Sequence, residues 1–177
     1  MRTAIFKIEV VPHDPNWSDK FREEAMHIAT ALGENVVAVH HIGSTSIPRI
    51  YAKPVIDILV EVKDVQAVDA DSLAMESLGY EVMGEFGIPG RRYFRKDDSG
   101  GNRTHQIHTF ETVSNQVIRH LAFRDYLIAH PEEAREYSDL KRQLAADHPT
   151  DADAYIDGKD PFIQEIDRRA AVWQNER

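Results

Sequence analysis

Residues 36 to 62 read VVAVHHIGSTSIPRIYAKPVIDILVEV, two apolar, β-branched runs separated by a loop that begins with Gly-Ser-Thr. Runs of this length and composition, bounded by glycine and proline, are typical of buried β-strands. We therefore expect strands at 36–42 and 55–62, joined by a loop from Gly43 to Pro54.

The sequence on either side of this pair predicts an alternation of strands and helices. Alternating apolar residues predict a strand at 4–10, and an apolar stripe from Trp17 to Leu32 predicts an amphipathic helix that ends at Gly33. Similar patterns predict a helix at 65–78, a hairpin of 80–83 with 91–96, a strand at 104–112, and helices at 115–130, 131–146 and 153–174. These elements indicate the α+β class, with a mixed sheet of about five strands, flanking helices and a helical C-terminal part.

Length and composition limit what the chain can be. Its 177 residues predict a single domain over 1–177, with an α/β core at about 1–112 and a helical part at about 113–177. The formal net charge of −9 disfavours nucleic acid and anionic membranes as partners, but it leaves room for a local basic pocket. The lack of cysteine excludes disulfide scaffolds, zinc-thiolate sites and cysteine nucleophiles. Without a signal-peptide pattern or a membrane-length apolar stretch, we expect a cytoplasmic protein.

Two features of the opening stretch carry chemistry. Gly43, Ser44 and Thr45 follow a strand and offer backbone N–H groups and two hydroxyls, which suit phosphate oxygens, although an ordinary strand-exit turn has the same composition. Asp57 lies within an otherwise apolar strand, where burial of a carboxylate is unfavourable unless a metal, a cation or a hydrogen-bond donor interacts with it. Lys53 could satisfy Asp57 as a simple ion pair or could itself bind an anion.

Gly-Ser-Thr followed, after Pro48, by Lys-Pro-Val-Ile-Asp-Ile-Leu-Val at 53–60 resembles the signature of the GrpB family, small proteins related to the nucleotidyltransferase superfamily. The resemblance extends over nearly the whole chain, through Asp14–Trp17, Arg91–Phe94, His105–His108, Leu121–Leu127, Tyr137, Leu140, Lys141, Tyr155, Lys159 and Phe162. It implies a nucleotidyltransferase-like core in which Ser44 is the phosphate-loop serine and Asp57 the first carboxylate for Mg or Mn.

Two positions depart from that pattern. Active members of the superfamily generally carry a second acid two residues after the first, about 7 Å away on the same strand face, but position 59 is leucine. Glu61 shares the face of Asp57 but lies about 13 Å along the strand. Arg49 stands where the family usually has glycine after the proline, and it either adds a phosphate contact or reshapes the loop.

Further candidates lie outside the opening stretch. His105 and His108 could supply the missing metal ligand, and His108 could also act in catalysis. Because they are three residues apart, they point to opposite faces of a regular strand, so at most one faces Asp57. Arg91 and Arg92 are candidate phosphate ligands beside Lys53. Arg124 and Lys141, on predicted helices, could also face the pocket, although exposed helix charges are usually solvated.

The sequence leaves three functions open. The first is a nucleotidyltransferase-like protein that binds a nucleotide or another phosphorylated small molecule, with metal-dependent nucleotidyl or phosphoryl transfer if it is catalytic. The second is a noncatalytic ligand-binding or protein-interaction module that kept the fold and lost the second metal carboxylate, for which Leu59 is the best evidence. The third is a metal hydrolase built on histidine and aspartate.

Overall fold

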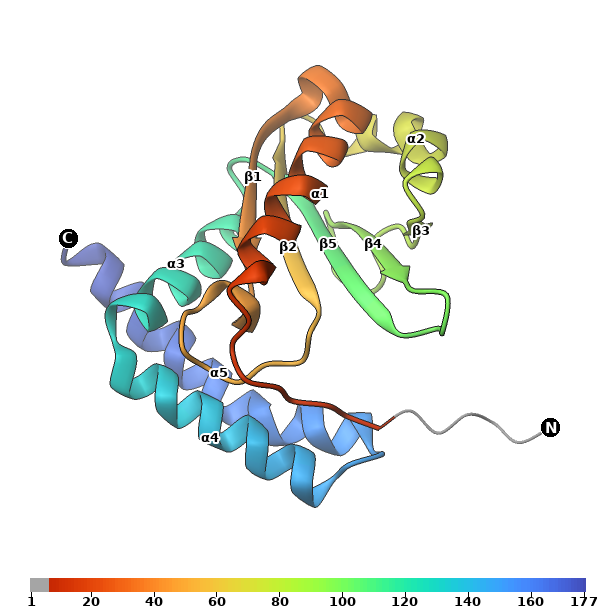
Figure 1. Cartoon of the computed structure of the whole chain (residues 1–177). Helices are drawn as coiled ribbons and strands as arrows, with labels where there is room; N and C mark the ends of the chain where they lie inside the picture. The colour runs from red at the N-terminus through yellow and green to blue at the C-terminus, as the bar shows by residue number, and fades with distance from the viewer. Residues whose placement is uncertain (1–6) are drawn as a thin grey trace.

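A mixed five-stranded sheet forms the centre of the part described by the computed structural model, residues 7–177 (Figure 1). Its strand order is β1-β2-β5-β4-β3. The central strands β2 and β5 run parallel, and every other neighbouring pair in the sheet is antiparallel. The strands are β1 (Val36–Ile42), β2 (Ile56–Val62), β3 (Glu81–Val82), β4 (Arg92–Asp97) and β5 (Arg103–Glu111).

Helices cover both faces of this sheet. On one face, β2 residues Ile56, Ile58 and Val60 pack with side chains of α1 and α2. On the other face, Leu59 packs against Val117 of α3. Helices α4 and α5 pack with α3 on that second side, as Figure 1 shows in teal and blue. The helices are α1 (Asn16–Leu32), α2 (Ser72–Ser77), α3 (Asn115–Ala129), α4 (Pro131–Asp147) and α5 (Ala152–Asn175).

Local signals in the sequence explain where the helices begin and end. The Asp14 carboxylate accepts a hydrogen bond from the Asn16 backbone N–H at 2.9 Å, and Gly33 takes a φ of +60° just after α1. Ser114 caps α3 and Asp151 caps α5, each through a side-chain oxygen that accepts a backbone N–H. The five-stranded mixed sheet and the helices around it confirm the predicted α+β class.

Three predicted elements differ from the structure. Of the strand predicted at 4–10, residues 4–6 lie outside the described part, and residues 7–10 form no regular structure. Val11 instead makes an isolated antiparallel bridge with Ala52, so this segment pairs with a loop and not with the sheet. The helix predicted at 65–78 is divided into a 3-10 helix (Gln66–Asp71) and the short α2. The first hairpin strand shrinks to the two residues of β3.

The strand register decides which side chains meet at one end of the sheet. Asp57 pairs with Ile42 at the end of β1 and with Gln106 near the start of β5. The C-terminal end of β1 therefore lies beside the N-terminal ends of β2 and β5. Asp57 shares its strand face with Leu59, so it lies on the face of the sheet that α3, α4 and α5 cover. Within residues 7–177, no helix combines the length and apolar character that crossing a lipid bilayer requires.

Candidate functional site

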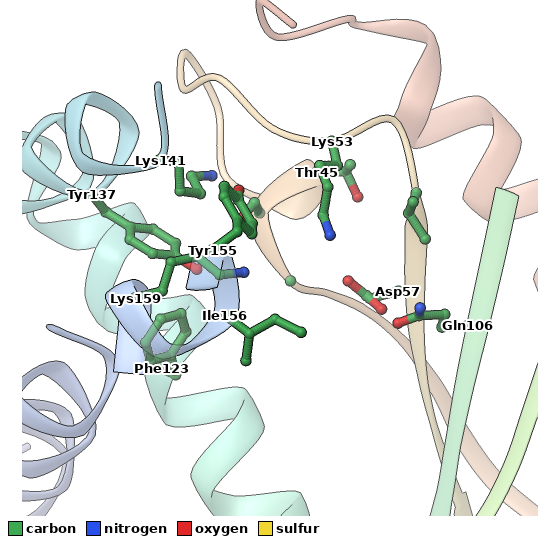
Figure 2. A pocket seen from close by; sticks show the side chains of 13 residues that line it. Thr45, Lys53, Asp57, Gln106, Phe123, Tyr137, Lys141, Tyr155, Ile156 and Lys159 are labelled. Atoms are coloured by element: carbon green, nitrogen blue, oxygen red, sulfur yellow. The ribbon is translucent and has the colours of Figure 1, made fainter. Parts of the chain in front are cut away.

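A cavity of about 310 Å³ lies at this end of the sheet, between the loop after β1 and the helices α4 and α5 (Figure 2). It contains four of the predicted ligand-binding residues together with the predicted carboxylate. The lining residues are Gly43, Ser44, Thr45, Lys53, Val55, Asp57, Gln106, Phe123, Tyr137, Lys141, Tyr155, Ile156 and Lys159.

The turn that follows β1 packs closely against Asp57. Gly43 has a φ of +72°, and a Cβ added there would lie 2.5 Å from Asp57 Oδ2, so only glycine fits without displacing the carboxylate. The Ser46 hydroxyl donates to the Gly43 carbonyl, and Thr45 Oγ1 lies 2.8 Å from His41 Nε2. The Gly-Ser-Thr turn is thus held in place directly beside the carboxylate.

Three lysines from three different parts of the chain converge on the cavity. Lys53 comes from the loop between β1 and β2, Lys141 from α4 and Lys159 from α5 (Figure 2). Lys141 is only 2% exposed, and within residues 7–177 its Nζ has no hydrogen-bond partner. A buried ammonium without a partner is costly, so this arrangement favours an anion in the cavity.

The electrostatics of the cavity reflect this surplus of positive charge. Burial and the neighbouring ammonium groups of Lys159 and Lys53 lower the pKa of Lys141 to about 7. Burial and the charge of Lys53 lower the pKa of Lys159 to about 8, against the opposing effect of Asp57. Burial also lowers the pKa of Lys53. A bound anion would offset these mutual repulsions.

Aromatic rings hold the three ammonium groups. Lys141 Nζ lies 4.4 Å from the centre of the Tyr137 ring, while Lys53 and Lys159 lie 5.0 and 4.6 Å from the Tyr155 ring centre. Cation–π contacts of this kind stabilise a cation without neutralising it. Burial raises the pKa of Tyr137 to about 12 and also raises that of Tyr155, so both hydroxyls stay protonated and can donate to an anion.

Of the helical residues that the sequence suggests could face the pocket, Lys141 lines it and Arg124 does not. The sequence interpretation gave no site role to Tyr137, Tyr155 or Lys159, although a signal was present. α4 carries Tyr137-Ser-Asp-Leu-Lys141 and α5 carries Tyr155-Ile-Asp-Gly-Lys159, two segments with a tyrosine four residues before a lysine. That spacing places both side chains on one helix face. A Cβ added to Gly158 would lie 2.4 Å from a methyl carbon of Leu144, so this glycine allows the two helices to approach closely.

His108 is the histidine that faces Asp57. Its Nε2 lies 3.6 Å from Asp57 Oδ1, and its Nδ1 lies 3.3 Å from the Arg91 guanidinium. Because a guanidinium can only donate, Nδ1 accepts this hydrogen bond, and Nε2 carries the ring proton in the neutral form. The nitrogen directed at Asp57 therefore has no lone pair for a metal ion, and its N–H faces the carboxylate from beyond hydrogen-bond distance.

The other predicted ligands do not line the cavity. His105 lies on the opposite face of the sheet, with Nε2 3.9 Å from Glu24 Oε2, so this candidate metal ligand does not join Asp57 and only one of the two histidines faces it, as strand geometry predicts. Arg92 is held away by Asp69, to which it makes hydrogen bonds of 2.7 and 3.2 Å. Arg49 is exposed and has a φ of +67°, a left-handed conformation that explains the glycine usual at this position.

Arg91 reaches the site only through His108. Its side chain is 7% exposed and donates hydrogen bonds to the carbonyls of Glu85 and Phe86. Its guanidinium also lies 4.7 Å above the Tyr93 ring. Arg91 therefore positions the imidazole of His108 and does not line the cavity itself.

A site with two carboxylates for metal does not fit these residues. Leu59, which occupies the position of the second acid, is fully buried and packs with Phe110 and Val117. Glu61 is already engaged, with Oε2 2.5 Å from His40 Nε2 and Oε1 accepting from the Thr112 hydroxyl at 2.9 Å. Within residues 7–177, no three His, Cys, Asp or Glu side chains are grouped to hold a metal ion. Asp57 is therefore the one carboxylate among the residues that line the cavity.

Comparisons with known proteins place the chain in a family. The family model described as GrpB protein matches residues 7–169. The UPF0157 protein YqkA of Bacillus subtilis is 45% identical over 171 residues, which are 97% of this chain and 49% of that protein. The chain thus spans about half the length of this curated relative.

Solved structures extend the comparison to the fold. The crystal structure of the conserved protein GrpB from Enterococcus faecalis has a TM-score of 0.87 and 46% identity, and the match covers 92% of this chain and 96% of that one. Terminal uridylyl transferase 4 from Trypanosoma brucei with bound dUTP has a TM-score of 0.55 and 12% identity, over 88% of this chain and 53% of that one, which is a likeness of fold alone. The chain belongs to the GrpB family, and its fold is distantly similar to that of nucleotidyltransferases.

Proposed function

We propose that this protein binds a nucleotide or another phosphorylated small molecule in the cavity between β2, α4 and α5. The observation that carries the proposal is the convergence of three lysines on a single carboxylate, with the Lys141 ammonium buried and unpartnered within residues 7–177. A phosphate group supplies both the negative charge and the hydrogen-bond acceptors that this ammonium lacks.

The chain's own residues would divide the work of binding. Lys53, Lys141 and Lys159 act as point charges for phosphate oxygens, and the partial burial of the cavity strengthens each of these interactions. Ser44 and Thr45 line the same space, where their hydroxyls and the backbone N–H groups of the turn can contact further oxygens.

Asp57 would hold a Mg²⁺ or Mn²⁺ ion together with the phosphates of the ligand. Mg²⁺ is commonly bound through one or two carboxylates and the oxygens of substrate phosphates, so one carboxylate is sufficient for this mode. Such an ion would supply charge stabilisation for nucleotidyl or phosphoryl transfer. The His108 Nε2–H, 3.6 Å from Oδ1, would attract the Asp57 carboxylate electrostatically without a hydrogen bond.

A noncatalytic ligand-binding module is the second candidate, and Leu59 favours it. Because the position of the usual second acid is filled by a fully buried leucine, the chain can hold a phosphorylated ligand without two protein carboxylates for metal. In that case the affinity for the ligand would depend on the lysines and be indifferent to metal and to Asp57.

A thermal-shift screen tests the proposal and separates the two candidates. Pyrophosphate, nucleotides and sugar phosphates are each added with and without Mg²⁺ or Mn²⁺ to the wild type, Asp57→Ala and Lys141→Met. A ligand at 100 times its Kd stabilises the folded state by about 2.7 kcal/mol. We expect at least one phosphorylated ligand to stabilise the wild type clearly more than it stabilises Lys141→Met.

The measurements with and without metal distinguish metal-dependent nucleotidyl or phosphoryl transfer from ligand binding alone. Stabilisation that requires both metal and Asp57 supports the metal-dependent candidate, and stabilisation that ignores both supports the noncatalytic module. If no phosphorylated compound stabilises the wild type at millimolar concentration, the proposal is wrong.

A further inference from the structure

A second cavity, of about 180 Å³, adjoins the lysine cavity across Asp57. The two cavities share Gly43, Asp57, Phe123 and Tyr137 in their linings. Because these shared residues include the carboxylate itself, one ligand can occupy both spaces and pass beside Asp57. The remaining residues that line the second cavity are Ile42, His108, Arg119, His120 and Ile163.

The second cavity differs from the first in its charge. Burial lowers the pKa of His120 to about 4, so its imidazole is neutral near pH 7. The Arg119 guanidinium lies at the rim, where its side chain is 43% exposed and already donates to Gln116 and Asp167. Apart from Asp57 at its boundary and Arg119 at its rim, the second cavity is lined by rings and aliphatic side chains, in contrast to the three lysines on the other side of Asp57.

Aromatic rings form part of the wall of this second cavity. The imidazoles of His108 and His120 are stacked, with ring centres 5.9 Å apart and an interplanar angle of 29°. Two rings outside the lining support them: Tyr93 lies 5.5 Å from His108, and Phe110 lies 6.1 Å from His120, between ring centres. Phe123 contributes a further ring that faces both cavities. Such walls suit a flat, uncharged ring system, which can lie against aromatic surfaces.

The two histidines differ in their hydrogen bonds. His120 Nδ1 lies 2.7 Å from the Gln116 carbonyl and so carries the ring proton, and its Nε2 accepts from the Arg119 guanidinium at 3.4 Å. His108 has the opposite arrangement, because Arg91 donates to its Nδ1, and its Nε2–H lies 3.6 Å from Asp57 Oδ1, beyond hydrogen-bond distance. The wall thus offers the His108 N–H as a donor to an acceptor on the edge of a heterocycle.

Building on the proposed function, we propose that the second cavity binds the uncharged heterocyclic ring of the same ligand whose phosphates lie among the lysines. The substrate class is then a phosphorylated compound that bears such a ring, a nucleoside diphosphate or a close relative, and not an inorganic or aliphatic phosphate. Asp57 lies at the boundary between the ring and the phosphates.

Calorimetric titration of matched probes tests this assignment. Pyrophosphate carries the charged group alone, ADP and UDP carry it with a ring, and ribose 5-phosphate carries a phosphate without a heterocycle. We expect the wild type to bind at least one of the nucleoside diphosphates at least tenfold more tightly than pyrophosphate or ribose 5-phosphate.

Two variants separate the ring cavity from the lysine cavity. His120→Leu removes one ring of the wall, and Ile163→Phe fills the space from α5. Each is expected to abolish the tenfold preference while leaving the affinity for pyrophosphate within about twofold of the wild type, which also shows that the variant is folded. Ile163→Phe provides the test if His120→Leu does not fold. Lys141→Met is expected to weaken pyrophosphate and nucleoside diphosphates alike.

The outcomes distinguish this inference from the function on which it rests. Equal affinity for pyrophosphate and both nucleoside diphosphates, or a preference that survives both substitutions, would overturn the ring assignment while the phosphate site stands. A free nucleoside that binds together with a nucleoside diphosphate would also overturn it, because the second cavity would then hold a separate molecule. Failure of pyrophosphate and every nucleoside diphosphate to bind would overturn both.

Discussion

Lys141 combines nearly complete burial with a charge that no group within residues 7–177 satisfies. We predict that Lys141→Met lowers the affinity for pyrophosphate at least tenfold, because a close ionic hydrogen bond to phosphate is lost. The same change should leave the free energy of unfolding unchanged or raise it by about 1 to 4 kcal/mol, since an apolar side chain replaces a buried charge. Calorimetry and urea denaturation measure the two effects.

Lys63→Met is the matched control, because Lys63 is exposed and lies outside both cavities. It should change neither the affinity nor the stability appreciably. A Lys141→Met variant that is folded and binds pyrophosphate as well as Lys63→Met does would contradict the role given to Lys141.

The pH dependence of stability is a second consequence of this lysine. Its pKa is about 7 in the folded protein and about 10.5 in an unfolded chain, so between these values the unfolded state binds a proton that the folded state does not. Stability contributed by the neutral amine is therefore complete above pH 10.5 and is lost as the pH falls through 7. We predict that the free energy of unfolding of the wild type, relative to Lys141→Met, rises with pH from 7 to 10, by at most about 1.4 kcal/mol per unit.

Urea denaturation of the two proteins at several pH values measures this difference. Lys159, with its pKa of about 8, also makes the free energy of unfolding rise with pH in both proteins. Its contribution cancels in the difference between them to the extent that the two lysines titrate independently. Parallel stability curves for the wild type and Lys141→Met over this range would show that Lys141 titrates normally.

Gly43 and Arg49 both have a positive φ, with different consequences. Gly43→Ala should lower the free energy of unfolding by about 1 to 3 kcal/mol and weaken pyrophosphate binding, because the new Cβ displaces Asp57. Arg49→Gly should leave binding unchanged and raise stability by at most about 1 kcal/mol, because it relieves a positive φ at an exposed position outside the cavity. A tenfold loss of affinity in Arg49→Gly would instead make Arg49 a phosphate ligand.

The residues near the opening stretch were predictable, whereas those from distant helices were not. Gly43, Ser44, Thr45, Lys53 and Asp57 line the cavity as their local pattern indicates. The opposite faces of His105 and His108 also follow from strand geometry, but which one faces Asp57 depends on the register that pairs Leu59 with His108. Lys141 and Lys159 enter through the packing of α4 and α5. The tyrosine–lysine spacing puts each pair on one helix face, but it does not specify that these faces meet at the cavity.

The contact between α4 and α5 controls how close the two helical lysines come. Glycine inside a helix normally costs about 1 kcal/mol relative to alanine, so Gly158→Ala would stabilise an isolated α5. We predict the reverse, a loss of about 1 to 3 kcal/mol, because the added Cβ meets Leu144 at 2.4 Å. Urea denaturation measures the change.

A double-mutant cycle gives this prediction its control. Leu144→Ala makes room for the new methyl group, so Gly158→Ala should cost much less in the Leu144→Ala background than in the wild type. An equal loss of stability in both backgrounds would show that the contact between α4 and α5 is not the cause of the loss.

Some helices and strands were easier to predict from the sequence than others, for physical reasons. The helices from α3 to α5 and the strands β1, β2, β4 and β5 have strong periodic patterns or apolar runs, and the structure contains all of them near the predicted bounds. The segment at 7–10 shows strand-like alternation but pairs with nothing in the sheet, since strand formation needs a partner edge as well as a pattern. Pro161 lies inside α5 without ending it, which shows packing overriding a local breaker.

For the molecule as a whole, net charge and site charge have opposite signs. The chain carries a formal charge of −9, while three lysines surround one carboxylate in the cavity. The overall balance disfavours polyanions as partners, whereas the cavity suits a small anion that can enter a partly enclosed space. The site is therefore a property of the fold, because it exists only after the sheet and the helical layer come together.

A crystal structure of the protein soaked in tungstate, a heavy-atom mimic of phosphate, tests the central claim most directly. We predict an anomalous peak in the cavity with oxygen atoms within hydrogen-bond distance of Lys141 Nζ and at least one of the Lys53 and Lys159 ammonium groups, and no such peak in Lys141→Met crystals. Anomalous peaks confined to the protein surface, or a peak in the cavity that persists unchanged in Lys141→Met, would contradict the account.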